Sequence, residues 1–175
     1  MILAAADPGK SGAVVTIDCV AKTGYYYPLE YDKTGLLHGP PIVALLAHTK
    51  PKRIFLEKVQ GRGHWNATAN FNFGICAGQL RYVLAHSGLP YQFMTAQAWQ
   101  KTAHEGIDTK LSAKAKSYQA YKNLFPHGPI PGGPRGGQPH DGVIDALLML
   151  VFGFEKFNVI PDDWQLEKWN GGVGL

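Results

Sequence analysis

Near its start the chain reads Ile2-Leu-Ala-Ala-Ala-Asp7-Pro-Gly-Lys-Ser-Gly-Ala13-Val-Val-Thr-Ile17, and this stretch decides the fold. A short apolar run ends at Asp7, a turn rich in Pro and Gly follows, and a β-branched run resumes at Ala13. Apolar runs bounded by such turn residues are typical of strands. A third run, over residues 25–31, comes after another short turn. The pattern therefore predicts an antiparallel meander of three strands.

Strands and helices alternate after this meander. Residues 53–57 form a nearly continuous apolar run, which is typical of a central strand covered on both faces. Residues 91–94 predict a further strand. Apolar residues at helical spacing predict helices over residues 42–48, 66–86, 96–101, 111–124 and 140–157. The order predicts an α/β fold, in which a mixed five-stranded sheet combines the antiparallel meander with parallel strands and is flanked by helices.

Composition favours one globular domain over residues 1–175, with a C-terminal arm from about residue 158. Hydrophobic residues make up 45% of the chain and charged residues 17%, which excludes a disordered protein. No apolar run approaches the roughly 20 residues that span a bilayer, and Asp7 and Lys10 interrupt any secretory signal. Cys19 and Cys76 have no zinc-type partner and are expected to be reduced. We therefore expect a cytoplasmic protein with no membrane partner.

Four carboxylates are candidates for a metal site. Asp7 and Glu57 each end a predicted strand, and ligand-handling residues of open α/β sheets collect outside such carboxyl ends. Asp141 and Asp145 lie four residues apart and therefore share one face of the last predicted helix. If that helix crosses the sheet, the four acids converge and repel one another unless cations bind between them. Oxygen ligands of this kind favour magnesium or manganese over zinc.

Each acid also has a structural alternative. Asp7 before Pro-Gly is a common turn residue, and Asp141 at a helix start is favoured by the helix dipole. Glu57 is harder to explain in this way, because a buried and unpaired acid in a central strand costs several kcal/mol. Asp145 sits inside an apolar helical turn, where an acid is equally unexpected. Together the four acids are far more specific than any one of them.

Three motifs resemble the RuvC family of Holliday junction resolvases. They are Asp7-Pro-Gly-Lys-Ser-Gly after the first strand, Phe55-Leu-Glu57 closing a later strand, and Asp141-Gly-Val-Ile-Asp145-Ala in the last helix. The stretch Phe73-Gly-Ile-Cys-Ala-Gly-Gln79-Leu-Arg81 is also similar to the family's Leu-Gly-Gln-Ala-Arg-Gly helix. The resemblance spans residues 2–155 and is closest to phage-encoded members, which implies the host cytoplasm as location. The family implies an RNase H-like fold, a homodimer, and paired cuts in a four-way DNA junction.

The resemblance also implies roles for individual residues. Asp7 and Glu57 would be metal ligands, and Asp145 would be the helix acid nearest to two bound Mg²⁺ or Mn²⁺ ions. Cellular members place an acid or histidine three residues before the last aspartate, whereas Asp141 lies four residues before it. His140 is a candidate ligand or proton-transferring residue, with a helix cap or a surface position as alternatives. Hydrolysis at such a site leaves 5′-phosphate and 3′-hydroxyl ends.

Basic and aromatic residues are candidates for DNA contacts. The net charge of +4 leans towards a polyanionic partner, although solvated charged faces give the same total. Trp65 could stack on an unpaired base or pack as a core residue above the following helix. Arg135, in a glycine-rich loop before the last helix, could reach the cut strand or remain in solvent. The full set of candidate DNA contacts is Lys110, Lys114, Lys116, Arg62, His64, Trp65 and Arg135.

Gly74 and Gly78 mark a possible packing face on the helix over residues 66–86. They lie four residues apart and therefore on the same side of that helix. Small residues in this arrangement allow close packing, either in a homodimer or against the chain's own sheet.

Three other functions compete with a junction resolvase. A broader branched-DNA or flap endonuclease would use the same acids and differ only in substrate. A phosphotransferase of the sugar-kinase and actin type begins with a similar Asp-x-Gly loop, but it needs a second domain that 175 residues cannot hold. A non-catalytic junction-binding module has no reason to keep four mutually repelling acids.

Overall fold

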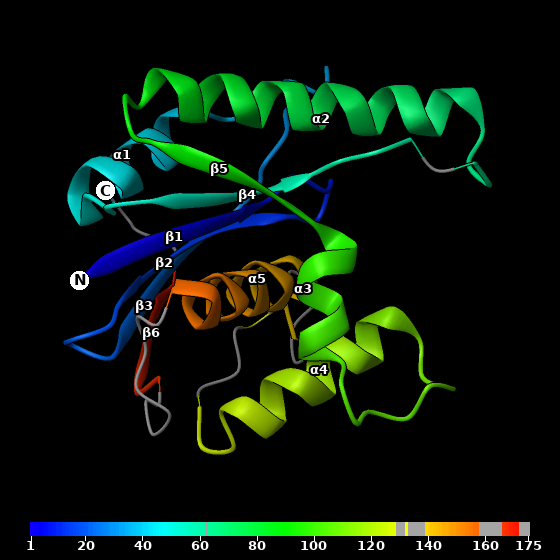
Figure 1. Cartoon of the computed structure of the whole chain (residues 1–175). Helices are drawn as coiled ribbons and strands as arrows, with labels where there is room; N and C mark the ends of the chain where they lie inside the picture. The colour runs from blue at the N-terminus through cyan, green and yellow to red at the C-terminus, as the bar shows by residue number, and fades with distance from the viewer. Residues whose placement is uncertain (62, 129–131, 133–138, 158–165, 172–175) are drawn as a thin grey trace.

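The computed structural model describes residues 1–61, 63–128, 132, 139–157 and 166–171. Its strands are β1 (Ile2–Asp7), β2 (Ala13–Asp18), β3 (Thr23–Pro28), β4 (Ile54–Lys58), β5 (Tyr91–Thr95) and β6 (Lys168–Gly171). They form one sheet in the order β5-β4-β1-β2-β3-β6 (Figure 1). β1 and β3 each pair antiparallel with β2, whereas β4 with β1, β5 with β4, and β6 with β3 pair in parallel.

This sheet confirms the predicted mixed topology, with its antiparallel meander and its parallel strands. The third strand ends at Pro28 rather than at residue 31, because the chain turns away there and Tyr31 makes only an isolated bridge. The sequence does not predict β6, since Lys168-Trp-Asn-Gly contains residues that are uncommon in strands. β6 pairs with the edge of β3 along its whole length, so tertiary pairing supplies what local propensity does not. Residues 158–165 of the predicted arm lie outside the described residues.

Five helices complete the described fold: α1 (Pro40–Thr49), α2 (Ala67–His86), α3 (Ala96–Ala103), α4 (Ala113–Leu124) and α5 (Asp141–Phe157). All five lie where apolar spacing predicts them, with ends that differ by two residues or fewer. Asn66, Thr95 and Ser112 each accept a hydrogen bond from the backbone N–H three residues later. Such caps satisfy donors that the first turn of a helix leaves without a partner. None of the described helices is long and apolar enough to cross a membrane.

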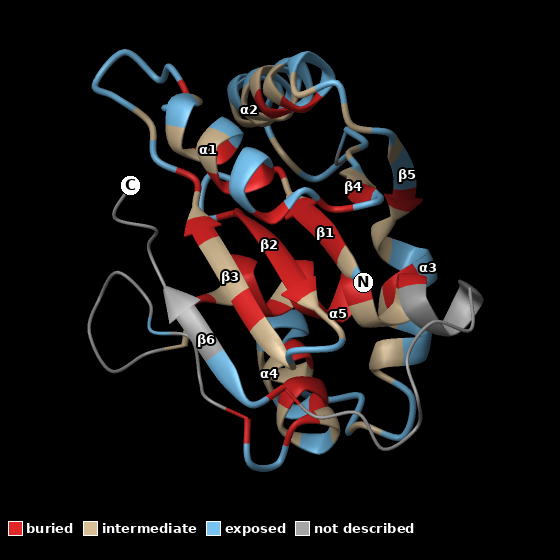
Figure 2. Cartoon of the chain, turned by 90° about the vertical axis from the view of Figure 1, so that its left-hand side faces the viewer, coloured by how far each residue is buried: buried red, intermediate tan, exposed pale blue. Residues whose placement is uncertain are grey.

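The helices cover the two faces of the sheet in different ways (Figure 1). α1 and α2 lie on one face, whereas α5 lies on the other, with α3 and α4 packed against α5. Side chains alternate along β1, so Ala4 and Ala6 join the core beneath α1 and α2, while Ala5 joins the core beneath α5. The buried residues of α2 are Leu80 and Leu84, and the rest of that helix is at least partly exposed (Figure 2).

α5 lies very close to the sheet because it carries glycine at two contact points. A Cβ on Gly153 would lie 2.6 Å from the ring of Phe55 on β4. A Cβ on Gly142 would lie 2.1 Å from the backbone oxygen of Ser11, in the turn between β1 and β2. A larger residue at either position would force the helix to move. The two glycines therefore set the height of α5 above the sheet and hold its N-terminus over the end of β1.

Candidate active site

Asp7 and Glu57 lie side by side at the carboxyl ends of β1 and β4. Ala6 of β1 pairs with Leu56 of β4 in parallel register, so the next residue of each strand is an acid. The residues two positions before these acids both belong to the core beneath α5, and side chains alternate along a strand. Asp7 and Glu57 therefore both point towards the α5 side of the sheet, at the carboxyl ends of neighbouring strands.

The N-terminus of α5 brings the other two acids to the same place. Asp141 is the first residue of α5, and Asp145 follows about one turn later on the same side of the helix. Asp145 lies near enough to Asp7 and Asp141 for their charges to raise its pKa. The position three residues before Asp145 is Gly142, which packs against the turn after β1. An acid at that position would collide with the turn, which explains why the nearby acid stands one residue earlier.

Asp145 carries the strongest electrostatic signal of the site. Burial raises the pKa of its carboxyl to about 7, with further increases from the neighbouring Asp7 and Asp141, while Ser117 and Lys114 oppose the shift. The side chain as a whole is partly buried, but its Oδ1 atom is shielded from solvent and has no hydrogen-bond partner among the described residues. An unsatisfied carboxylate oxygen beside two other acids is costly unless a cation binds there.

Asp141 is bound by a lysine from the neighbouring helix. Lys114 of α4 donates a hydrogen bond from Nζ to Oδ2 of Asp141. The Lys114 side chain is 70% exposed and the Asp141 side chain 40%, so solvent screens the pair and it adds little stability. The sequence predicts Lys114 as a phosphate contact, and the structure places its ammonium at the edge of the acid cluster.

Two residues outside the predicted set contact the acids, Trp99 from α3 and Ser117 from α4, and a third, His104, contacts Ser117. Trp99 is fully buried and donates a hydrogen bond from Nε1 to Oε2 of Glu57 at 3.2 Å. Ser117 contacts the Asp145 carboxyl, and its Oγ lies 3.2 Å from Nε2 of His104. A signal for Trp99 exists in the order of elements, because β5 pairs with β4 to its last residue and α3 follows at once. No comparable signal points to Ser117, whose contact depends on how α4 packs against α5.

The donor set suits a hard divalent cation in its chemistry. Carboxylate oxygens are the ligands that Mg²⁺ and Mn²⁺ prefer. Within the described part of the chain, no three acidic, histidine or cysteine side chains lie close enough together to hold an ion in their present rotamers. The shielded Oδ1 of Asp145 is nevertheless an atom that a cation would satisfy, and Asp7 is the acid that most affects its pKa. The residues therefore fit the ion, and side-chain rotation would have to complete the ligand set.

His140 is buried at the start of α5. It is 4% exposed, and its Nδ1 accepts a hydrogen bond from the backbone N–H of Val143 at 3.3 Å. Burial lowers the pKa of its imidazole, although the nearby Asp141 acts in the opposite direction. A neutral imidazole that accepts from the first turn of a helix acts as a cap. This geometry agrees with the helix-cap alternative for His140.

The predicted basic contacts gather partly on α4. Lys110 precedes this helix and is exposed, while Lys114 and Lys116 lie in its first turns, exposed and half-buried respectively. Arg62 and Arg135 lie outside the described residues. The three lysines thus lie on or just before α4, the helix that contacts Asp141 and Asp145.

Trp65 packs against α2 instead of standing alone in solvent. Its ring meets the ring of Phe73 edge to face, with centroids 5.4 Å apart. Asn70 donates a hydrogen bond from Nδ2 to the Trp65 backbone oxygen at 3.1 Å. His64 is exposed beside the Trp65 ring. Trp65 is therefore half-buried against the start of α2, outside both cores, and His64 is the exposed member of the pair.

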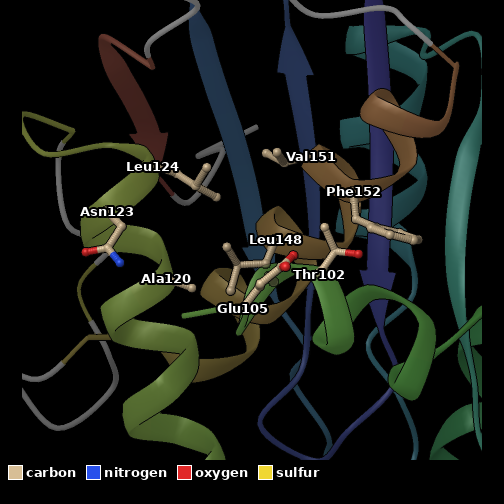
Figure 3. A pocket seen from close by; sticks show the side chains of 9 residues that line it. Thr102, Glu105, Ala120, Asn123, Leu124, Leu148, Val151 and Phe152 are labelled. Carbon is tan, nitrogen blue, oxygen red and sulfur yellow. The ribbon is translucent and has the colours of Figure 1, made fainter. Parts of the chain in front are cut away.

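A hollow between α3, α4 and α5 is separate from the acids (Figure 3). Its lining includes Leu148 and Phe152 of α5 and the polar Thr102 of α3, but none of the four acids. Another hollow does contain Glu57, together with the start of α3 and Phe73 of α2. The second hollow opens at the strand ends and is the better candidate for contact with a substrate strand.

The fold of this chain matches solved structures, although no protein-family model and no curated protein matches its sequence. T. thermophilus RuvC in complex with a Holliday junction substrate has a TM-score of 0.53 and 14% identity, over 91% of this chain and 97% of that one. Another Thermus thermophilus RuvC structure has a TM-score of 0.51 and 12% identity, over 91% and 98% of the two chains. The chain therefore has the RuvC-like, RNase H-like fold that its motifs imply.

Proposed function

We propose that this chain is a metal-dependent endonuclease of branched DNA, with four-way junctions as its preferred substrate. The observation that carries the proposal is the shielded Oδ1 atom of Asp145, which no described residue satisfies and whose carboxyl lies within electrostatic range of Asp7 and Asp141. A non-catalytic binding module would gain nothing from such a cluster, because buried like charges destabilise a fold. The fold similarity to a RuvC in complex with a Holliday junction substrate supports the choice of substrate.

The four acids would share the binding of two Mg²⁺ or Mn²⁺ ions. Asp7, Glu57 and Asp145 would be ligands, and Asp141 would complete the set from the first turn of α5. Bound divalent cations supply activation of a water nucleophile and stabilisation of the leaving 3′ oxygen. The chain orients the carboxylates, because β1 and β4 run in register and Gly142 fixes α5 above them. The expected products carry 5′-phosphate and 3′-hydroxyl ends.

Lysines near α4 would supply the contacts to DNA phosphates. Lys110, Lys114 and Lys116 stand on or just before the helix that touches Asp141 and Asp145. Contacts of this kind position a DNA backbone without reading its sequence. The arrangement therefore supports binding of a DNA backbone next to the acid cluster.

A homodimer is the assembly that we propose for paired cuts. The exposed residues of α2 include an apolar stripe at helical spacing, called here the α2 stripe, which consists of Phe71, Gly74, Ile75, Gly78 and Tyr82. Its two glycines also line a hollow beside Leu56 and Phe93 of the sheet. Phe71, Ile75 and Tyr82 are 69%, 40% and 64% exposed. A Cβ on Gly74 or Gly78 would meet nothing within 4 Å, which argues against the alternative that these glycines pack on the chain's own sheet. Such a stripe suits a second copy of the same helix.

Cleavage of a synthetic four-way junction in Mg²⁺ or Mn²⁺ tests the proposed function. The wild type should nick two strands of like polarity symmetrically. Asp7→Asn should lower the cleavage rate at least about 100-fold while junction binding persists. Loss of a metal ligand should reduce activity more than loss of a residue that only orients a ligand, which typically costs about 10–100-fold. Asp18→Asn is a matched control, because Asp18 also ends a strand but pairs with Ile2 at the opposite end of the sheet. It should cut like the wild type.

Three outcomes would change the proposal. Binding without cleavage by the wild type in either metal would overturn the enzyme. Unchanged cleavage by Asp7→Asn would discard the site. Faster cleavage of flaps or forks than of junctions would replace the junction by a broader class of branched DNA.

A further inference from the structure

We propose that α3 holds two of the candidate ligands in place, Glu57 through Trp99 and Asp145 through the His104–Ser117 pair. These three residues are then positioning residues of the metal site. The inference rests on the proposed function for the role of the acids, and it goes beyond that function by assigning the helix that orients them.

Trp99 acts on Glu57 from a fully buried position. An indole has one donor, Nε1–H, and a buried indole needs an acceptor for it. Oε2 of Glu57 accepts this hydrogen bond at 3.2 Å. Trp99 is 0% exposed and belongs to the core beneath α5, so its ring cannot turn without disturbing that core. The direction of the N–H therefore restricts the rotamers of Glu57.

The second connection runs from the C-terminal end of α3 to α5. His104 follows the last residue of α3, and its Nε2 lies 3.2 Å from Oγ of Ser117 on α4. Ser117 is 4% exposed and also contacts the Asp145 carboxyl. A metal-binding Asp145 is ionised and can only accept, so in that state the Ser117 hydroxyl donates to it, and Oγ can accept from Nε2–H in the tautomer of His104 that carries this proton. The donors then run in one direction, from His104 through Ser117 to Asp145.

Both connections start from one short helix. The rings of Trp99 and His104 meet edge to face, with centroids 6.0 Å apart and an interplanar angle of 76°. Thr95 caps the start of the helix by accepting a hydrogen bond from the Ala98 N–H at 3.3 Å. Figure 1 shows α3 between the end of β5 and the pair formed by α4 and α5. α3 thus joins the acid at the end of β4 to the acid on α5.

Loss of either connection should weaken metal binding rather than DNA binding. Removal of an outer contact that orients a metal ligand typically costs about 10–100-fold in metal affinity or activity. Trp99→Phe keeps a buried ring and loses only the N–H, so it should raise the half-saturating Mn²⁺ concentration about 10-fold or more. Ser117→Ala should act in the same direction, and Ser117→Thr, which keeps the hydroxyl, should restore most of the affinity.

The test is Mn²⁺ binding to the full chain without DNA, measured by calorimetric titration or by the electron paramagnetic resonance signal of free Mn²⁺. Phe125→Leu is the matched control. Phe125 is buried in the same core as Trp99 and packs its ring against Tyr121, with centroids 5.5 Å apart. This control should lower the Tm and leave the Mn²⁺ midpoint unchanged. Junction affinity without divalent metal should stay the same in every variant.

The outcomes separate this inference from the proposed function. Wild-type Mn²⁺ affinity in both Trp99→Phe and Ser117→Ala would overturn the inference and leave the nuclease standing. Weaker Mn²⁺ binding in both variants of a chain that cuts no branched DNA would uphold the inference and remove the nuclease. An equal loss in Phe125→Leu would also overturn the inference, because general packing would then set the affinity. A wild type that binds no Mn²⁺ would overturn both.

Discussion

The helices on the two faces of the sheet differ in what they leave without a partner among the described residues. Beneath α5 the apolar packing is complete, since Val143, Leu147 and Leu150 are all 0% exposed, yet Asp145 stands among them. On the opposite face α2 buries only Leu80 and Leu84, which lie one turn apart, and the α2 stripe is exposed. On the α5 face one carboxylate oxygen of Asp145 has no partner among the described residues, whereas on the α2 face the described residues leave an apolar stripe uncovered.

Alanine substitutions at Gly142 of α5 and Gly78 of α2 should give the largest difference in stability between the two faces. Gly142→Ala should destabilise the fold by about 3 kcal/mol, because its Cβ would overlap the Ser11 oxygen and α5 would have to move. Gly78→Ala should instead add about 0.5–1 kcal/mol, because its Cβ meets nothing within the chain and alanine favours the helix. Chemical denaturation at one protein concentration measures both changes. Equal effects of the two substitutions would contradict the difference in packing.

A charge in the α2 stripe should break the proposed dimer. Ile75→Glu should weaken self-association about 100-fold, because it places an unpaired carboxylate within an apolar interface. Sedimentation or light scattering across a concentration series provides the measurement. Val20→Glu is the control, since Val20 is 81% exposed in the turn after β2, away from α2. A wild type that stays monomeric throughout, or a dimer that survives Ile75→Glu, would reject the α2 stripe as the interface.

Asp145 should link the stability of the metal-free protein to pH. The pKa of its carboxyl in the folded chain is about 7, against an ordinary value of 3.8. Between pH 3.8 and about pH 7 the folded chain holds a proton on Asp145 that the unfolded chain has released. The contribution of Asp145 to the free energy of unfolding therefore falls as pH rises through this range, and it is constant above both pKa values. Asp145→Asn should therefore raise the free energy of unfolding at about pH 8 by on the order of 2 kcal/mol, and much less near pH 4.

Thermal unfolding without divalent metal at the two pH values checks this prediction. A gain of about 2 kcal/mol corresponds to roughly 4–8 °C in Tm for a chain of this size. Divalent metal should then stabilise the wild type more than Asp145→Asn. The same Tm change at both pH values would refute a raised pKa at this carboxyl.

Lys114 should give the smallest effect on stability. Its pair with Asp141 is exposed and screened, so Lys114→Met should change the free energy of unfolding by less than about 0.5 kcal/mol. If Lys114 contacts a phosphate, the slope of log affinity against log salt should fall by about one for junction binding. A titration in KCl measures that slope. A large loss of stability with no change in slope would make Lys114 a structural residue instead.

Local patterns in the sequence account for most of the fold. The meander and the five helices follow from apolar periodicity and turn residues, which act over a few positions of the chain. β6 does not, because Lys168-Trp-Asn-Gly has weak strand propensity and depends on an edge of β3 far away in sequence. The same limit applies wherever one segment owes its conformation to a distant partner.

The candidate site shows the same difference between features set by local sequence and features set by contacts between distant segments. Asp7, Glu57 and Asp145 could be named from residue type and position, because two of them follow the carboxyl ends of predicted strands and the third lies within an apolar helical turn. The shift of the remaining acid to Asp141 could not be explained from sequence, since it depends on the contact of Gly142 with a turn. The order of elements brings Trp99 near Glu57, but its hydrogen bond depends on how α3 packs, and the contact of Ser117 depends on how α4 packs against α5.

The most direct measurement of the central claim is anomalous diffraction from crystals soaked in Mn²⁺. We expect a manganese peak between the Asp7 and Asp145 carboxylates, with Oδ1 of Asp145 at about 2.0–2.4 Å from the ion. The same soak of Asp145→Asn crystals should lose the peak or show it at much lower occupancy. A wild-type structure at saturating Mn²⁺ with no peak at these carboxylates would contradict the account.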